Sequence, residues 1–314
     1  MSVIQTLKQT AQADLKTIVL PEGNDPRVVK AAEQLADENL VRPILLNGAT
    51  DHAGVTLIDT TDHDYRAELV ELFYQLRQHK GVSLEDAAAA VDAPLTFGAL
   101  MVRQGLADGC VAGAVHATRD VLRAALQLVG LQEGNNLASS IFLMILPDGR
   151  AITYGDCGMV PDPTVSQLAN IAVTSAKTHT QLTGEEPKVA MLSFSTKGSA
   201  DSESVQKVRQ ATEMAQQLAP AMQIDGELQF DAAYVPSVGE RKAAGSQVAG
   251  YANVFIFPNL DAGNIGYKIT ERVGGAQAIG PLLQGFAKPI HDLSRGSKTE
   301  DIVMAAVIAA VQAG

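Results

Sequence analysis

The chain has 314 residues, of which 46% are hydrophobic and 19% charged, and its formal net charge is −11. This composition is typical of a globular protein with a large core, and the length is sufficient for two domains. The acidic balance disfavours nucleic acid and anionic membranes as the main partners. The start of the chain lacks the apolar core of a signal peptide, and the longest apolar run, 302–311, is too short to span a bilayer. We therefore expect a soluble cytoplasmic protein without a membrane partner.

The N-terminal part alternates patterns of strand and helix. Residues 17–23 and 43–48 predict buried strands on either side of a helix over 25–38. Strand, helix and strand at this spacing form a βαβ unit, which predicts a parallel sheet covered on both faces. The patterns that follow predict helices at 65–79, 83–91, 95–105 and 118–130, and a strand at 109–114.

The pattern changes near residue 138, where we place a domain boundary. Residues 139–158 predict two antiparallel strands joined by a Pro-Asp-Gly turn. Helices and strands then alternate again, with helices expected at 164–181, 202–218 and 261–273 and strands at 188–194 and 252–258. A last helix is expected over 298–313, and its pattern alone does not assign it to either half.

Several motifs that identify common enzymes are missing from the sequence. It has no G-x-x-x-x-G-K-[ST] phosphate loop, no G-x-G-x-x-G after a strand, no H-E-x-x-H and no Cys/His metal spacing. His116 and His291 stand in loops, where a lone histidine is usually a surface residue, and we predict no catalytic histidine. Cys157 could be a nucleophile, but the two cysteines, Cys110 and Cys157, give no disulfide pattern, and a buried thiol is the simpler interpretation.

Two glycine-containing loops follow predicted strands and precede helices, at 192–200 and 257–268. In α/β sheets anions bind at this position, although ordinary strand-to-helix connections have the same layout. Arg77 and Arg123 lie on predicted helices, where an arginine is more often solvated than bound to a ligand. The sequence leaves both alternatives open for the loops and for the arginines.

The segment before the last helix concentrates polar residues ahead of a strongly apolar run. Ser297 and Glu300 fit an S-x-x-E capping box, with Ser297 as the N-cap and Asp301 at about the fourth helical position. Capping does not explain Ser294 and Arg295, which lie upstream of it. A Ser-Arg-Gly loop at a helix N-terminus is suited to an anion, because free N–H groups and a guanidinium are combined there.

Taken together, these segments resemble phosphate acetyltransferases, which move an acetyl group between coenzyme A and phosphate. The resemblance extends over nearly the whole chain, and its most specific stretches are "DGELQFDAA", "VAGYANVFIFPNLDAGNIGYK", "GPLLQGFAKPIHDLSRGS" and "EDIV". Shorter stretches that contribute are "LPEGNDPR", "LRQHKG", "GMVPDPT", "NIAVTSAKT" and "KVAMLSFSTKGSA".

The resemblance implies an α/β fold of two three-layer domains with mainly parallel sheets flanking a cleft, similar to isocitrate and isopropylmalate dehydrogenases. The last helix of this family returns to the first domain, which implies domains of 1–138 with 298–314 and of 139–297, with the active site in the cleft between them. It also implies a homodimer and a role in acetate metabolism. Coenzyme A or acetyl-CoA and phosphate or acetyl phosphate would be the substrates, and no cofactor or metal is expected.

The resemblance also places functional residues one at a time. The cleft Ser-Arg pair of the family falls on Ser294 and Arg295, and its catalytic aspartate on Asp301. Its two substrate-binding arginines fall on Arg77 and Arg123. Lys197 is a tentative ligand for the adenosine 3′-phosphate of coenzyme A.

These residue types suit a direct transfer in a ternary complex, in which the thiolate of coenzyme A attacks acetyl phosphate. A thiol has a pKa of about 8.5 and an ordinary Asp of about 3.9, so Asp301 is a suitable base only if burial raises its pKa. We therefore expect a partly dry carboxylate. Arg295 and the Ser294 hydroxyl would stabilise the oxyanion of the transition state.

Two other functions remain open at this stage. The first is a phosphate butyryltransferase-like enzyme, because those enzymes share a weaker version of the same motifs. The second is a non-catalytic domain that senses acetyl-CoA. The complete Ser-Arg and Asp set argues against the second.

Overall fold

The computed structural model describes residues 2–314, which divide into two compact α/β units. One unit contains Ile4–Gly134 and Phe286–Gly314, and we call it the first unit. The second unit contains Asn135–Gly285, together with Ser2 and Val3. Every helix within residues 2–314 is either too short or too polar to span a bilayer.

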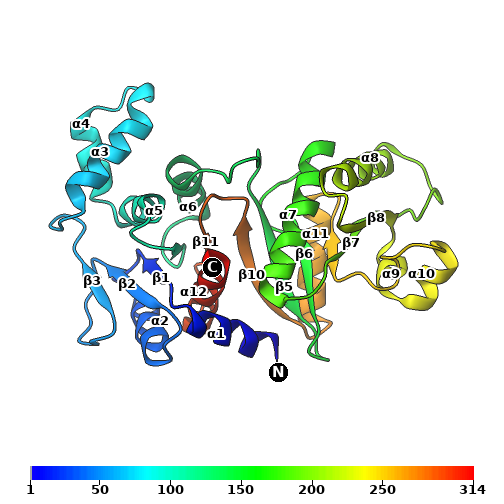
Figure 1. Ribbon diagram of the computed structural model, residues 1–314, viewed down its shortest axis with the longest axis horizontal. Helices are drawn as coiled ribbons and strands as arrows, with labels where there is room; N and C mark the ends of the chain where they lie inside the picture. The colour runs from blue at the N-terminus through cyan, green and yellow to red at the C-terminus, as the bar shows by residue number, and fades with distance from the viewer. Residues whose placement is uncertain (1) are drawn as a thin grey trace. The chain divides into compact units, whose positions relative to one another are not determined.

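The first unit is built on a five-stranded sheet in the order β11-β4-β1-β2-β3 (Figure 1). All neighbouring strands in this sheet are parallel. The strands are β1 (Thr17–Leu20), β2 (Arg42–Leu46), β3 (Thr56–Ile58), β4 (Gly109–Ala112) and β11 (Ile290–Asp292). This confirms the predicted βαβ unit and parallel sheet.

Helices of the first unit pack in two groups. The helices α2 (Pro26–Asp37) and α12 (Thr299–Ala313) lie side by side, and α5 (Pro94–Gln104) packs with α3 (Arg66–Arg77) and α6 (Thr118–Ala124). The remaining helices of the unit are α1 (Val3–Ala13) and α4 (Leu84–Val91). A π-helical turn, Ala125–Val129, continues α6, so the predicted helix over 118–130 is confirmed with a change of hydrogen bonding in its second half.

The second unit has a six-stranded mixed sheet in the order β10-β5-β6-β9-β7-β8. Its strands are β5 (Ser139–Ile145), β6 (Ala151–Gly155), β7 (Lys188–Leu192), β8 (Gln223–Leu228), β9 (Val254–Ile256) and β10 (Gln277–Gln284). The pairs β10–β5 and β5–β6 are antiparallel, which confirms the predicted hairpin across residues 139–158. The pairs from β6 through β9 and β7 to β8 are parallel.

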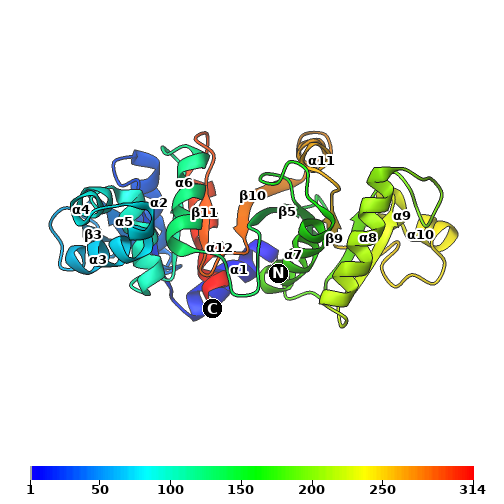
Figure 2. The same ribbon diagram turned by 90° about the horizontal axis from the view of Figure 1, so that it is seen from above.

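Long helices α7 (Val165–Thr183) and α8 (Glu203–Leu218) of the second unit lie next to each other (Figure 2). The shorter helices are α9 (Phe230–Tyr234), α10 (Pro236–Lys242) and α11 (Leu260–Arg272). Side-chain caps explain where several helices begin. Thr164 and Gln167 form a capping box for α7, and the Asn259 side chain accepts a hydrogen bond from the N–H of Ala262 in α11.

The boundaries of the two units differ from the predicted ones. We expected residues up to 297 to belong to the second domain, but the structure assigns Phe286–Gly314 to the first unit. The physical reason is the strand β11, which pairs in parallel with β4 at the edge of the first sheet. The sequence "IHD" gave no strand signal because two of its three residues are polar. The strand β10 was also missed, since Gly280 and Pro281 interrupt its pattern and its register shifts between Ile279 and Leu282.

The last helix forms much of the core of the first unit. Every residue of α12 from Ile302 to Val311 is buried, and the helix contacts α2, β4 and β1. A helix that is apolar on all sides is stable only when it is enclosed. Because α12 begins directly after β11, this enclosure also fixes where the loop 293–298 lies.

Substitution at the centre of this helix is expected to destabilise the first unit. Ile308 is fully buried, so Ile308→Ala should lower the free energy of unfolding by about 2–5 kcal/mol through lost burial and a residual cavity. Chemical denaturation followed by circular dichroism measures this change. Leu84→Ala is the matched control, since Leu84 is 53% exposed in the same unit and its truncation should change stability much less than that of the fully buried Ile308. Equal effects of the two substitutions would contradict the assignment of α12 to the core.

Candidate active site at the carboxyl edge of the first sheet

The loops that follow β1, β4 and β11 lie together because these three strands are parallel neighbours. Their carboxyl ends meet at one edge of the sheet, which is where open α/β sheets bind ligands. Helices α2 and α12 begin at this edge, so their N–H groups and the positive ends of their dipoles are located there. We take this edge as the candidate site.

The buried carboxylate of Glu22 organises one side of the edge. It follows β1 and accepts hydrogen bonds from four successive backbone N–H groups, those of residues 113–116, at 2.7–3.1 Å. The Nδ1 atom of His116 lies 2.8 Å from the same carboxylate. Burial alone would raise the pKa of Glu22, but the hydrogen bonds from His116, Val115 and Gly113 hold this pKa below its ordinary value.

Gly113 allows this loop to approach β11 closely. Its φ of +107° is rarely adopted by residues with side chains, and a Cβ placed on it would lie 2.5 Å from both Asp292 Oδ1 and the Leu293 nitrogen. Asp292 is itself buried, and burial raises the pKa of its carboxyl group to about 6. None of Glu22, Gly113 or Asp292 stands out as a site residue in the sequence.

The guanidinium of Arg27 connects the two loops. At the start of α2, it donates to the carbonyl oxygen of Ala114 at 2.9 Å, to that of Arg295 at 2.9 Å and to that of Ser297 at 2.7 Å. Asp25, the N-cap of α2, holds the same guanidinium through an ion pair of 2.7 Å. A lysine could not satisfy this set of acceptors with a planar fork of donors. Arg27 therefore fixes the segment that carries Ser294 and Arg295.

Ser294 and Arg295 lie in the exposed loop between β11 and α12. The Ser294 hydroxyl oxygen accepts a hydrogen bond from the N–H of Gly296 at 3.2 Å. The Arg295 guanidinium makes no hydrogen bond or ion pair with any part of the chain that the structure describes. A cation fixed through its backbone but unpaired at its head group is suited to bind an anion.

Asp301 lies in the first turn of α12, close in sequence to this loop, but two details differ from the predictions. The N-cap is Lys298 and not Ser297, and Asp301 is the third helical residue, whose carboxylate accepts from the N–H of Lys298 at 2.8 Å. Ser297 is buried, with its carbonyl bound to Arg27, which removes it from the capping position. The Asp301 side chain is exposed, so the expectation of a partly dry carboxylate is wrong for this structure.

The two predicted arginine ligands lie on helices of the first unit, and the helix of Arg123, α6, packs against β11. Arg77 ends α3, and its half-buried guanidinium has no hydrogen-bond or ion-pair partner among residues 2–314. Arg123, on α6, is exposed and forms an ion pair with Asp120 at 2.6 Å. Neither arginine forms a hydrogen bond or ion pair with Ser294, Arg295 or Asp301 within the described residues. The expected position of the site between the two domains stays a prediction.

Lys197 belongs to the second unit, where its ammonium forms an ion pair with Asp225 and donates to the Gly226 carbonyl at 3.0 Å. The loop 192–200 that carries it is folded around the buried carboxylate of Glu227. This carboxylate accepts from the Ser195 hydroxyl at 2.8 Å, from the Gly198 N–H at 2.9 Å and from Arg209 at 3.0 Å. Burial would raise the pKa of Glu227, but these partners lower it to about 2. For the loop 192–200, the sequence left open an anion site and an ordinary strand-to-helix connection. The second describes the structure better, because the N–H of Gly198 and the hydroxyl of Ser195 already bind the internal carboxylate of Glu227.

Both cysteines are fully buried, and burial raises the pKa of both thiols. A protonated thiol in the core is a poor nucleophile, which agrees with the simpler interpretation of Cys157. Among residues 2–314, no group of three or more His, Cys, Asp or Glu side chains is arranged to hold a metal ion.

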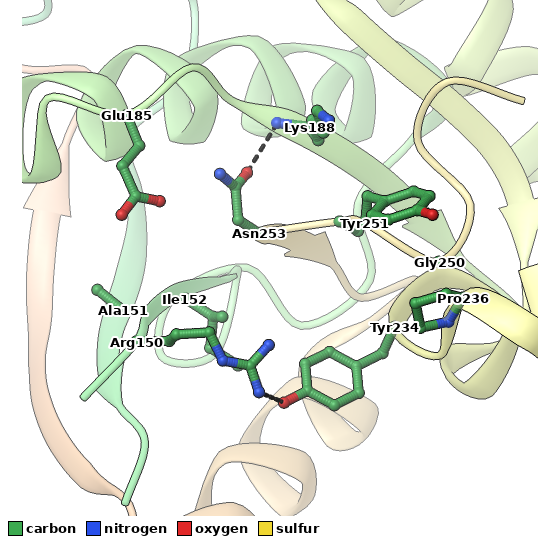
Figure 3. Close-up of a pocket in the computed structure, with 11 residues that line it drawn as sticks. Arg150, Ala151, Ile152, Glu185, Lys188, Tyr234, Pro236, Gly250, Tyr251 and Asn253 are labelled. Atoms are coloured by element: carbon green, nitrogen blue, oxygen red, sulfur yellow. Dashed lines mark hydrogen bonds between the residues drawn. The ribbon is translucent and has the colours of Figure 1, made fainter. Parts of the chain in front are cut away.

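The second unit also has a cavity of about 400 Å³ near the amino ends of β6, β7 and β9 (Figure 3). Figure 3 shows the Arg150 guanidinium directed at the Tyr234 hydroxyl, which it binds at 2.6 Å, and Arg150 also pairs with Asp148 at 2.7 Å. Glu185 adds negative charge to the lining. The cavity lies at the amino ends of the strands, whereas α/β sheets bind ligands at the carboxyl ends, and its Arg150 is already paired with Asp148. The cavity is therefore a weaker candidate for the site than the carboxyl edge of the first sheet.

Fold and site together define an α/β protein that presents fixed cationic and hydroxyl groups at the carboxyl edge of a parallel sheet. The family model described as "Phosphate acetyl/butaryl transferase" matches residues 2–310. The chain belongs to this family, and it is an enzyme of the transferase class.

Individual relatives match over their full length. The chain is 45% identical to "Phosphate acetyltransferase" of Acetivibrio thermocellus over 327 aligned residues, which cover 100% of this chain and 98% of the relative. Among solved structures, it is similar to "EutD phosphotransacetylase from Staphylococcus aureus", with a TM-score of 0.94, 44% identity and coverage of 99% and 98%. A phosphotransacetylase from Streptococcus pyogenes has a TM-score of 0.93 at the same identity and coverage. These likenesses confirm the family and the fold class that the sequence predicted.

Titration of the Glu22–His116 pair should make stability depend on pH. Glu22 raises the pKa of His116 above 6.5, so the stabilisation by this pair is fully present below pH 6.5 and is lost as the pH rises through the raised value. The depressed pKa of Glu22 means that the same pair also weakens as the pH falls below 4.5. Asp120 on α6 adds negative charge near His116, and Asp292 and Arg27 flank Glu22.

Urea denaturation of the wild type and of His116→Gln at several pH values tests this prediction. The difference in unfolding free energy, about 1 kcal/mol at most for a partly exposed pair, should be largest between pH 4.5 and 6.5 and should shrink at higher pH. A difference that grows with pH would show that the pair is not ionic.

Proposed function

We propose that this chain catalyses the reversible transfer of an acetyl group between coenzyme A and phosphate, acetyl-CoA + phosphate = acetyl phosphate + CoA. The observation that carries the proposal is the full-length similarity to proteins named phosphate acetyltransferase, at about 45% identity. The loop with Ser294 and Arg295 supports it, because an unpaired guanidinium at the edge of a parallel sheet suits the anionic substrates of this reaction.

Transfer is direct, in a ternary complex, by attack of the coenzyme A thiolate on the carbonyl carbon of acetyl phosphate. Coenzyme A is a substrate, and no acyl-enzyme, metal or other cofactor takes part. The burial of both thiols argues against a covalent cysteine intermediate. Orientation of the two substrates and stabilisation of developing charge would then supply most of the rate enhancement.

Three residues act on the reacting atoms in this proposal. The Ser294 hydroxyl and the Arg295 guanidinium stabilise the oxyanion that develops on the carbonyl oxygen, and one preorganised donor is typically worth about 3 kcal/mol. Asp301 accepts the thiol proton. Its exposed carboxylate in the first turn of α12 is accessible to a bound substrate, although it also caps the helix.

The remaining predicted residues bind charged parts of the substrates. Arg77 and Arg123 would bind phosphoryl oxygens, for which a planar guanidinium is better suited than an ammonium. Lys197 would bind the adenosine 3′-phosphate, and it would have to exchange its ion pair with Asp225 for that contact. The free head group of Arg77 makes it the better-supported ligand of the three.

A homodimer in the cytoplasm is the proposed state of the protein. The dimer is supported by three apolar side chains spaced four residues apart on α11 and at its end, Ile265, Ile269 and Val273, all of which are more than half exposed. Such a row on one helix face is characteristic of a surface that is covered by another chain.

A coupled assay of phosphate-dependent thiol release from acetyl-CoA tests the function. Acetyl-CoA should be turned over only when phosphate is present, and butyryl-CoA should react much more slowly. Preference for butyryl-CoA would favour the phosphate butyryltransferase alternative. Binding of acetyl-CoA without any turnover would favour the non-catalytic sensor.

Variants of the three proposed catalytic residues should fold normally and lose turnover. Ser294→Ala, Arg295→Gln and Asp301→Glu each alter an exposed side chain, so we expect kcat to fall by about 10²-fold or more while thermal stability changes little. Glu300→Gln and Arg119→Gln are the matched controls, since both side chains are exposed in the same unit and have no proposed role. Wild-type turnover in any of the three variants would remove that residue from the mechanism.

A further inference from the structure

We propose that His116 is a catalytic acid, which gives its Nε2 proton to the phosphoryl oxygen that leaves when acetyl phosphate reacts with coenzyme A, and takes a proton back in the reverse direction. This inference rests on the proposed function and extends it to a residue that the sequence analysis set aside.

The ring of His116 has one occupied and one available nitrogen. Nδ1 lies 2.8 Å from the Glu22 carboxylate, so the proton of a neutral ring is held on Nδ1 and the ring is fixed in one orientation. Nε2 has no hydrogen-bond partner among the described residues, and it is not buried, since the side chain is 32% exposed. A carboxylate that orients one imidazole nitrogen while the other faces the reaction is the arrangement used in acid–base catalysis by histidine.

The position of His116 relative to the proposed catalytic loop follows from shared contacts. Strands β4 and β11 pair in parallel with Ala112 opposite Asp292, so the chain leaves both strands at the same level of the sheet. The guanidinium of Arg27 then binds the Ala114 carbonyl in one loop and the Arg295 carbonyl in the other. His116 lies two residues beyond Ala114, and its backbone N–H is fixed by Glu22. These contacts place the free Nε2 at the same edge as Ser294 and Arg295.

The reaction requires an acid at this place. When the thiolate attacks the dianion of acetyl phosphate, the C–S bond forms and the C–O bond to the phosphoryl group breaks. Without a proton, the departing group would be the strongly basic trianion of phosphate. Transfer of the Nε2 proton gives hydrogen phosphate instead, and the proton removed from the thiol by Asp301 returns to solvent as His116 is reprotonated. Atoms and charge therefore balance, with no further reactant.

The charges around His116 favour the protonated ring. Glu22, through its hydrogen bond and its charge, raises the pKa of His116 above 6.5, and Asp120 on α6 acts in the same direction. Burial alone would lower this pKa. Arg27 lies beside Glu22 and neutralises part of its charge, and the buried Asp292 lies on the neighbouring strand. The resulting imidazolium is an acid near neutral pH, where such groups act most efficiently.

Two acetyl donors with different leaving groups test the proposal. The His116→Gln variant should lose about 10²-fold or more in kcat with acetyl phosphate, the usual contribution of a general acid. With acetyl methyl phosphate, whose leaving group is the weakly basic dianion of methyl phosphate, the same variant should lose less than about tenfold. Equal losses with both donors, or no loss with acetyl phosphate, would overturn the assignment.

Chemical rescue gives a second measurement that does not depend on the methyl donor. Imidazole added to His116→Ala should restore part of its turnover of acetyl phosphate, whereas imidazole should not restore Ser294→Ala. Absence of rescue, combined with equal losses of the glutamine variant on both donors, leaves His116 with a structural role only.

The matched control is His52→Gln. His52 pairs with Asp37 at 2.9 Å, but Asp37 ends α2, at the opposite end of the helix from Arg27. This substitution should leave turnover unchanged, and a loss equal to that of His116→Gln would overturn the specific role of His116.

If the wild type itself fails to exchange acetyl groups between coenzyme A and phosphate, the proposed function is wrong. If the wild type is active and His116→Gln is equally active, only the present inference is wrong.

Discussion

The carboxylate of Glu22 is the interaction on which the candidate site depends. A buried, ionised carboxyl group is costly unless its charge is compensated, and here four backbone N–H groups and one imidazole provide that compensation. The consequence is a loop of defined shape after β4. Because Arg27 binds backbone carbonyls of this loop and of the segment after β11, the position of Ser294 and Arg295 is set without using their side chains.

Much of the fold could be predicted from periodicity and turn residues, because those signals are local. The βαβ unit, the hairpin of β5 and β6, the helices α2 to α8 and the helices α11 and α12 follow from the spacing of apolar residues and from turn residues, whereas the short helices α9 and α10 were not predicted. The strands β10 and β11 could not be predicted in this way. One contains Gly280 and Pro281, and the other is three residues long and mostly polar, so only their pairing with β5 and β4 makes them strands.

The sequence singles out residue types that carry chemistry, and it does not single out residues whose role is to position other groups. A Ser-Arg pair before a helix stands out in a sequence, and Ser294 and Arg295 do lie in the exposed loop before α12. Glu22 and Arg27 gave no comparable signal, since an isolated Glu or Arg near a helix start is usually a surface residue. Their importance arises from partners about 90 and 270 positions away along the chain, which no local pattern reveals. The predicted cap at Ser297 failed for the same reason, because its carbonyl is bound by the distant Arg27.

Buried acids organise the loops at the carboxyl ends of strands in both units, but they leave different groups available. In the second unit, Asp156 accepts from the N–H groups of Gly158 and Val160, and Glu227 holds the loop that carries Lys197. The ammonium of Lys197 is then engaged in an ion pair with Asp225. In the first unit the same type of support leaves the Arg295 head group and His116 Nε2 without protein partners in the described chain. Binding of an anion costs least where its donors are already fixed and need not first give up another partner. This difference in available donors is the physical reason for placing the candidate site in the first unit.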